Sequence, residues 1–198
     1  MTHVIESKHL KGIQGNLVIT QESCMVQTII DDTTLKEWVV PLFHRSPELS
    51  EVSVPIDSNI LHNHEVLLID KTHIHVDDIS YPYKQGDIIG WETRLPELLA
   101  IIRVPIVSDG VKGLCTLWIK DGQLHIKTED SIVYHYRLLY TFKDSTTCIN
   151  GGVIRNIFND HRGELCKIYM EEDFPVCLEF TNAFELKTRY YIAPCVPE

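Results

Sequence analysis

Residues 163–198, GELCKIYMEEDFPVCLEFTNAFELKTRYYIAPCVPE, decide the fold of this chain. Three strand-like runs follow one another here, separated by Glu171-Glu172-Asp173 and by a break around Asn182. Apolar and polar residues alternate within the runs, as a half-buried strand requires, and acidic or amide residues mark the turns. Short connections join antiparallel neighbours, so this stretch predicts three consecutive antiparallel strands.

Upstream of this stretch the pattern mixes strands with two short helices. Asp121-Gly122 is the strongest local hairpin signal, and it separates the strands 113–120 and 123–128. Asn150 is a suitable N-cap and Gly163 a suitable stop for a short helix between them. A helix is also predicted over Leu95–Arg103, from Pro96 in its first turn and an apolar face, and a strand over 132–140.

The first half of the chain is also rich in strand patterns. The runs 17–20, 24–30 and 36–43 are strand-like, and residues 65–69 and 72–76 form a hairpin around Asp70-Lys71. Residues 8–16 and 57–62 are candidates for two stunted helices, and 80–90, with Pro82, Gly86 and Gly90, for a linker. The expected fold class is therefore α+β, mostly antiparallel sheet with a few short helices.

The composition is that of an ordinary globular protein. The 198 residues are 44% hydrophobic and 23% charged, with no apolar run long enough to span a bilayer and no secretory signal pattern. Six cysteines are scattered without a C-x-x-C pair, and several occupy apolar strand positions, where a reduced thiol is expected. We expect an intracellular protein, nuclear or cytoplasmic, of cellular or viral origin, that does not associate with membranes.

The formal net charge of −10 argues against nucleic acid covering the whole surface. It does not exclude a protein that shows cations to nucleic acid on one surface only. The positions of Lys and Arg decide between these cases.

The second half resembles the eukaryotic and archaeal DNA sliding clamps, the proliferating cell nuclear antigen family. The resemblance is carried by Lys120-Asp121-Gly122 between two strands, by the short helix at 153–159, by Phe174-Pro175-Val176 and by 190–194, Tyr-Tyr-Ile-Ala-Pro. It covers residues 90–196, about half the chain. Clamp protomers contain two domains of one topology, so the resemblance implies a reduced or divergent first domain, residues 1–80, a linker, 81–91, and a clamp-like second domain, 92–198.

The resemblance implies a processivity factor rather than an enzyme. Such a chain closes a ring of identical subunits around duplex DNA, without reading its sequence, and docks a DNA polymerase and other replication proteins through short peptides. No cofactor is implied. Ring closure needs a head-to-tail contact between sheet edges, for which strand 111–120 and the N-terminal strands are the candidates.

A clamp presents cations from its inner helices to phosphate, and the sequence offers six candidates. Arg155 and Arg162 are seven residues apart and so would share one face of a helix, with Ile154, Ile157 and Phe158 on another face. An ordinary solvated charge is an equally good interpretation of any single candidate. The DNA-facing candidates are Lys8, Lys11, Arg94, Arg103, Arg155 and Arg162.

The resemblance also places partner peptides beneath the linker and against the C-terminal tail. An apolar linker beside a terminal strand would form a small groove for an aromatic anchor. The alternative is that the isoleucines begin a core strand. The docking candidates are Tyr81, Pro82, Ile88 and Ile89 in the linker and Ala193, Pro194 and Cys195 in the tail.

Two H-x-H pairs on one hairpin offer an alternative function, metal binding. Residues i and i+2 of a strand share a face, so His62 with His64 and His73 with His75 could combine into a zinc site. Catalytic zinc would leave a position for water, with Glu65 or Asp77 as base. The chain has no G-x-S-x-G, P-loop, G-x-G-x-x-G or H-E-x-x-H motif. A metal-dependent enzyme and a clamp-shaped module that binds only proteins therefore remain the alternatives.

Overall fold

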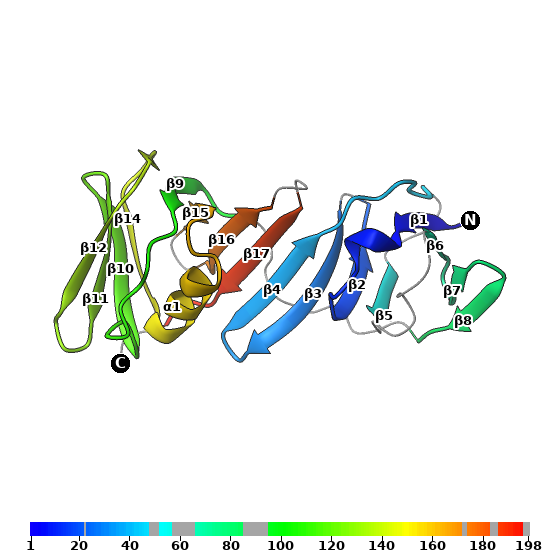
Figure 1. Ribbon diagram of the computed structural model, residues 1–198, viewed down its shortest axis with the longest axis horizontal. Coiled ribbons are helices and arrows are strands. Elements are labelled where there is room, and N and C mark those ends of the chain that lie inside the picture. The colour runs from blue at the N-terminus through cyan, green and yellow to red at the C-terminus, as the bar shows by residue number, and fades with distance from the viewer. Residues whose placement is uncertain are drawn as a thin grey trace. The chain divides into compact units, whose positions relative to one another are not determined.

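The structure, a computed structural model, describes residues 1–21, 23–47, 52–56, 66–84, 95–171, 174–182 and 186–195. The chain divides into two compact units (Figure 1). The first unit comprises Met1–Thr28 and Glu37–Trp91, and the second comprises Ile29–Lys36 and Glu92–Glu198. The tip of one hairpin, residues 29–36, therefore belongs to the second unit, although its base belongs to the first.

The first unit is built from strands and a single 3₁₀ turn among its described residues. Its elements are β1 (His3–Glu6), η1 (Ser7–His9), β2 (Gly15–Ile19), β3 (Cys24–Asp31), β4 (Thr34–Val39), β5 (Val52–Ile56), β6 (Val66–Ile69), β7 (His73–Val76) and β8 (Ile79–Pro82). The strands form two antiparallel groups, β1-β6-β7-β8 and β4-β3-β2-β5. Buried side chains of both groups, such as Ile5, Leu17 and Leu67, share one hydrophobic cluster with Leu10, which follows η1.

The second unit contains two antiparallel sheets and the α-helix of the described residues. Its elements are β9 (Leu98–Arg103), β10 (Leu114–Lys120), β11 (Gln123–Thr128), β12 (Val133–Arg137), β13 (Tyr140–Thr141), β14 (Ser145–Asn150), α1 (Gly151–Asp160), β15 (Leu165–Tyr169), β16 (Val176–Thr181) and β17 (Lys187–Ile192). The strand orders are β12-β11-β10-β14 and β13-β9-β15-β16-β17.

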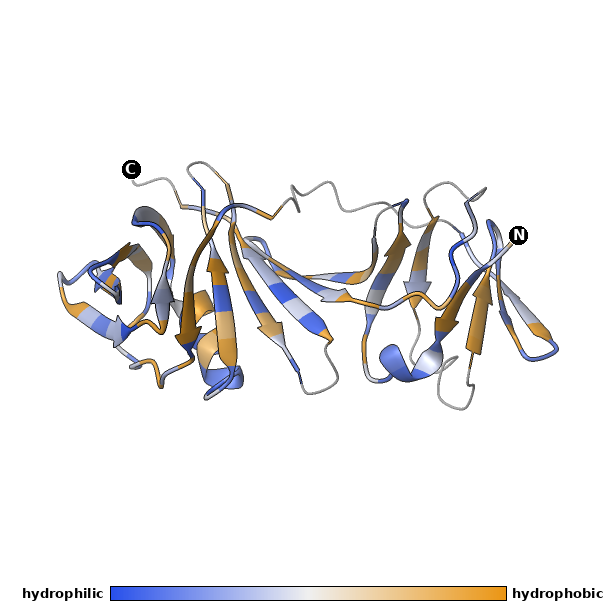
Figure 2. Ribbon diagram, turned by 90° about the horizontal axis from the view of Figure 1, so that it is seen from above, coloured by the Kyte–Doolittle hydropathy of each residue, from blue (hydrophilic) through white to orange (hydrophobic). Residues whose placement is uncertain are grey.

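Alternation along these strands explains how the core of the second unit forms. Successive residues of a strand point to opposite faces of its sheet. Hydrophobic and hydrophilic residues follow one another along the strands (Figure 2), and in β10 every second residue from Cys115 to Ile119 is buried. The inner faces, with residues such as Leu117 and Leu178, pack into one cluster together with Ile154, Ile157 and Phe158 of α1. The helix is thus held by burial of its apolar stripe.

Local backbone chemistry confirms the predicted hairpin. Asp121 and Gly122 both have positive φ, 52° and 73°, as a two-residue turn between antiparallel strands requires. β10 and β11 pair in register from Cys115 opposite Thr128 to Lys120 opposite Gln123. The three predicted C-terminal strands also form, as β15, β16 and β17.

The predicted helix over Leu95–Arg103 is wrong. Residues 98–103 form β9, which pairs with β15 on one side and β13 on the other. A short apolar run fits either a helix or a buried strand, and here strand pairing with residues far along the chain decides. The run buries Leu99 and Ile102 while both strand neighbours satisfy its backbone.

Three further expectations need correction. The N-terminal helix predicted over 8–16 is only the three-residue η1, since β2 begins at Gly15. Tyr81 and Pro82 lie in strand β8 rather than in a linker. Strand β10 is not an edge, because β11 and β14 flank it, whereas β1 is an edge of its sheet. The predicted helix over 57–62 lies outside the described residues, as does most of the predicted linker.

The antiparallel, strand-dominated α+β architecture agrees with the predicted fold class. Among the described residues, no helix has the length and apolar character needed to cross a membrane.

Candidate functional site

Helix α1 is the element of the second unit that sequence patterns assign to a DNA-facing surface. The side chain of Asn150 accepts a hydrogen bond from Gly152 N at 2.9 Å and caps the first turn. A side chain at Gly151 would collide with the sulfur of Cys115, so this glycine lets the helix begin close to β10. Beyond the helix, Gly163 has a φ of +81° and turns the chain into β15.

The solvent side of α1 is nearly neutral. Arg155 is half-buried, and its guanidinium donates to the carbonyl of Asp109 at 3.0 Å. Asn156, Asn159 and Asp160 are the exposed residues of this helix. One cation and one anion therefore stand on α1, and the helix alone offers phosphate little attraction.

The structure separates the predicted cations of the second unit. Arg162 lies two residues beyond the end of α1 and is exposed, so it does not share a helical face with Arg155. Arg103 follows the buried Ile102 on β9 and therefore points to the sheet face opposite the core and α1. Its guanidinium donates to the carbonyl of Gly163 at 3.0 Å. Arg103 and Arg155 thus serve different surfaces.

A cation that sequence patterns missed lies on the α1 side of the sheet. The ammonium of Lys36, on the hairpin tip, sits 5.1 Å from the ring centroid of Tyr190. Burial lowers the pKa of Lys36, and the nearby Asp160 carboxylate acts in the opposite direction. No motif marks this residue, because only the packing of the hairpin tip against β17 brings it there.

The same region holds an aromatic cluster around His161. Its Nε2 lies 2.9 Å from the Tyr190 hydroxyl, and its Nδ1 lies 3.1 Å from Glu164. The imidazole also stacks on Phe180, with the ring centroids 3.9 Å apart. Burial raises the pKa of Tyr190 well above its ordinary value. This cluster fixes the turn that carries Arg162 beside the sheet.

The remaining DNA-facing candidates are Lys8 and Lys11 near the N-terminus and Arg94. Lys8 forms an ion pair with Glu6, and hydrogen bonding from Lys8 lowers the pKa of the Glu6 carboxyl. Lys11 is exposed in the turn that follows η1. Arg94 lies outside the described residues.

The C-terminal tail is fixed by backbone hydrogen bonds. Ala193 N donates to the carbonyl of Thr33 on the hairpin tip, and Cys195 N donates to the carbonyl of Cys148 on β14, both at 2.7 Å. On the same tip Ile29 and Ile30 are 53% and 51% exposed. The tail and the tip together offer an apolar surface whose isoleucines no motif singled out.

The linker candidates do not lie in one segment. Tyr81 and Pro82 pair with Ile74 and His73 in the β7–β8 hairpin, and Tyr81 packs against the core of the first unit. Ile88 and Ile89 lie outside the described residues. A docking groove formed by these four residues therefore stays a prediction.

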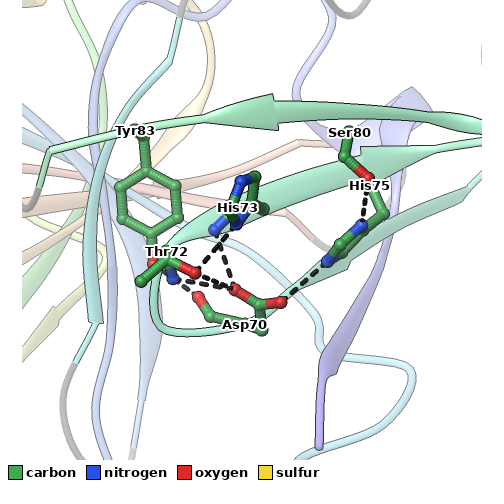
Figure 3. A network of polar contacts seen from close by, with 6 residues as sticks. All are labelled: Asp70, Thr72, His73, His75, Ser80 and Tyr83. Carbon is green, nitrogen blue, oxygen red and sulfur yellow. Dashed lines mark hydrogen bonds and ion pairs between the residues drawn. The ribbon is translucent and has the colours of Figure 1, made fainter.

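The histidine hairpin holds a hydrogen-bonded network around Asp70 (Figure 3). The Asp70 carboxylate accepts from the backbone N–H groups of Thr72 at 2.7 Å and His73 at 2.8 Å, and its second oxygen lies 2.8 Å from His75 Nε2. Burial would raise the pKa of Asp70, but hydrogen bonds from His75 and these amides hold it well below its ordinary value. The network closes the turn between β6 and β7.

The imidazole of His75 has no nitrogen left for a metal in this arrangement. Its Nδ1 lies 2.7 Å from the Ser80 hydroxyl, while His73 Nδ1 lies 2.8 Å from the Thr72 hydroxyl. His62 and His64, the other predicted ligands, lie outside the described residues. Within the part of the chain that the structure describes, no three His, Cys, Asp or Glu residues cluster around a metal position.

Buried thiols offer no evident nucleophile either. Burial raises the pKa of Cys24 to about 12 and that of Cys166 well above its ordinary value. Thiols in such surroundings stay protonated and unreactive.

Comparison with known proteins identifies the architecture. No family model matches the sequence, and no curated protein matches it. Solved structures do match. A. fulgidus PCNA bound to the C-terminal region of FEN-1 is 13% identical, with a TM-score of 0.60 over 100% of both chains. The chain has the fold of a DNA sliding clamp.

Two further clamps support this assignment. PCNA from Entamoeba histolytica is 14% identical, with a TM-score of 0.59 over 98% of this chain and 99% of that one. The DNA polymerase sliding clamp of Pseudomonas aeruginosa is 11% identical, with a TM-score of 0.64 over 100% of this chain and 67% of that one. The likeness to sliding clamps, predicted from the second half alone, therefore extends over both units.

Proposed function

We propose that this protein is a sliding clamp that encircles duplex DNA and holds replication proteins on it. The observation that carries the proposal is the clamp fold along the whole chain, at TM-scores of 0.55–0.64. The neighbouring structures include PCNA with a FEN-1 segment and a PCNA2–PCNA3 complex. They support peptide docking and oligomer formation as the activities to test.

The DNA-facing surface of the proposed clamp includes the α1 side of the second unit. Arg155, Lys36 and Arg162 supply its cations, with Lys8, Lys11 and Arg94 as candidates elsewhere. Arg103 is left out because it projects from the opposite sheet face. So few cations give weak, sequence-blind phosphate contacts, which suit a ring that has to slide.

Ring closure would use strands at sheet edges. β12 ends one sheet of the second unit, and β8 ends one sheet of the first. An edge strand offers unpaired N–H and C=O groups to another chain. When two different edges pair head to tail, identical subunits form a closed ring if the rotation from one subunit to the next divides a full turn evenly.

The outward backbone groups of β12 can be identified from its pairing. Thr128 N donates to Ile132 O, and Leu138 N donates to Gly122 O, so the even-numbered residues face β11. The N–H of Val133 therefore points away from the sheet. Val133→Pro removes this one donor while keeping every β11–β12 hydrogen bond, a substitution that edge strands tolerate.

The first experiment is the mass of the native particle, measured by light scattering behind a sizing column at several concentrations. A closed multimer is expected for the wild type, and Val133→Pro is expected to shift it toward the monomer without loss of circular dichroism. The multimer should be retained on closed circular duplex DNA and released when the circle is cut. A monomer at every concentration, with no retention, would contradict the clamp.

A protein-binding module of clamp shape is the second candidate. The near-neutral solvent side of α1 favours it, because one cation opposite one anion gives DNA little to bind. Such a module would stay monomeric or pair with another chain, and it would capture peptides with no dependence on DNA.

A further inference from the structure

The four strands of the β12-β11-β10-β14 sheet place cations, and no carboxylates, on its solvent face. None of these four strands contains Asp or Glu, although the chain holds 28 acidic residues in 198. Lys120, Lys127 and Arg137 all project from this face and are exposed. The nearest acids along the chain, such as Asp121 and Glu129, lie in the connecting turns, and the Glu129 carboxylate accepts from Leu114 N at the start of β10. A positive face in a chain with a net charge of −10 indicates an anionic partner.

A row of rings crosses the middle of this face. The strand register places Thr146, Trp118, His125 and His135 opposite one another across the four strands. The Trp118 and His125 rings stack in parallel, with centroids 4.8 Å apart and planes 6° apart. His135 meets His125 edge-on at 4.8 Å.

Hydrogen bonds fix the orientation of the His125 and His135 imidazoles beside the Trp118 indole. His125 Nε2 lies 3.3 Å from the carbonyl of Lys120, which can only accept, so this nitrogen carries the hydrogen. His125 Nδ1 then accepts from His135 Nδ1, 2.7 Å away. The indole is therefore supported on the His125 side before any partner arrives.

On the side of Trp118 away from His125, the strand register places Thr146 of β14. Thr146 stands opposite Trp118 on β14, is exposed, and is too short to cover the indole. Cations lie in the two rows of residues that flank the row of rings. Lys120 and Arg137 belong to the row on one side, and Lys127 belongs to the row on the other side. Rows on one face are about 6.7 Å apart, since residues i and i+2 of a strand share a face.

We propose that this sheet face binds single-stranded DNA, with a base stacked on Trp118 and phosphates beside Lys120, Lys127 and Arg137. An aromatic platform between cations is how single strands are bound without sequence preference. An acidic peptide would pair with the cations but has no need of the indole. The duplex buries its base faces in its own stack and so cannot use Trp118. The site goes beyond encirclement, since a short linear strand needs no ring.

Fluorescence anisotropy of a labelled oligo(dT) of about ten nucleotides, within the site sizes of such platforms, tests the proposal. Trp118→Leu keeps an apolar side chain and removes the ring, and it is expected to weaken binding about fivefold or more, the worth of one stacked base. The same substitution should leave binding to a duplex of equal length unchanged.

The cations are tested with a matched pair of double variants. Lys120→Gln with Lys127→Gln should reduce the slope of log K against log salt concentration by about 1.4, or 0.7 for each phosphate contact on a single strand. Lys112→Gln with Lys143→Gln removes the same charge at exposed positions outside these four strands and should change the slope little.

Three results would overturn the proposal: equal binding by wild type and Trp118→Leu, equal salt slopes for the two double variants, or competition by polyglutamate as strong as by oligo(dT). The last result would assign the face to an acidic protein. Retention on circular duplex DNA is measured separately, so failure of the ring and failure of this site are distinguishable.

Discussion

The two units of the chain are built from similar antiparallel hairpins but close their cores differently. In the second unit, helix α1 buries Ile154, Ile157 and Phe158 in the hydrophobic core. In the described part of the first unit, the segment after the single 3₁₀ turn contributes only Leu10 and the partly buried Ile13 to the core. Among the described residues, an α-helix therefore contributes to the core of the second unit alone.

The polar interior differs as well. Among the described residues, the buried side-chain polar atoms without a hydrogen-bond partner belong to His3, Gln27, Arg45 and Ser53, all in the first unit. Each such atom costs about 1–3 kcal/mol. The residues of the first unit also hold 11 Asp and Glu against 5 Lys and Arg. The comparison indicates that the first unit is the less stable of the two.

The largest expected effect comes from removing the helix's central side chain. Phe158→Ala leaves a cavity in the core cluster that both sheets of the second unit share, where the ring is fully buried, and should lower the free energy of unfolding by about 3–5 kcal/mol. Hydrogen exchange read by mass spectrometry should show lost protection in the second unit. Equal loss of protection in both units would show that the two compact units unfold together rather than separately.

The next effect concerns the carboxylate of Glu179, 2% exposed on β16. It lies 2.8 Å from Arg189 Nε on β17 and 3.8 Å from Lys167 Nζ on β15. Glu179→Ala leaves the largely buried Arg189 without this anion, and should cost about 1–3 kcal/mol in thermal unfolding.

Glu97→Ala is the control for Glu179→Ala, because Glu97 pairs with Lys143 at the surface, with side chains 56% and 61% exposed. It should cost at most about 1 kcal/mol. Equal costs for the two substitutions would show that burial of the Glu179 carboxylate contributes nothing.

A smaller effect tests the helix cap. Asn150→Ala removes the side-chain acceptor of Gly152 N and should cost about 1 kcal/mol, measured by urea unfolding. Asn156→Ala, on the exposed side of the same helix, should be nearly neutral. If the two alanine variants are equally stable, the cap does not hold α1.

The smallest effect concerns pH and the first unit. Burial, with Arg45 and His44 nearby, lowers the pKa of His3 below its usual 6.5. As the pH falls through 6.5, His3 becomes protonated in the unfolded chain but stays neutral in the folded one. The contribution of His3 to the free energy of unfolding is therefore present above pH 6.5 and is lost on acidification.

His3→Gln should flatten the dependence of unfolding free energy on pH between about 7 and 5, the range in which an unperturbed histidine titrates. His135→Gln, at an exposed position of the second unit and away from His3, is the control. An unchanged pH dependence in His3→Gln would show that another group carries it.

The sequence by itself determined the parts of this protein that depend on neighbouring residues. Asp121-Gly122 makes its turn through the positive φ of two adjacent residues, and Asn150 caps α1 across two positions. The three C-terminal strands follow from alternation and turn residues within 163–198. Their order was enough to predict the clamp fold from half the chain.

Only the tertiary structure decided which residues share a surface. Leu98–Arg103 became a strand because β13 and β15 pair with it, and this pairing sent Arg103 away from Arg155. Lys36 reached Tyr190 through the packing of a distant hairpin tip. Rows such as Trp118, His125 and His135 depend on the register between strands, which follows from burial over the whole sheet rather than from any local pattern.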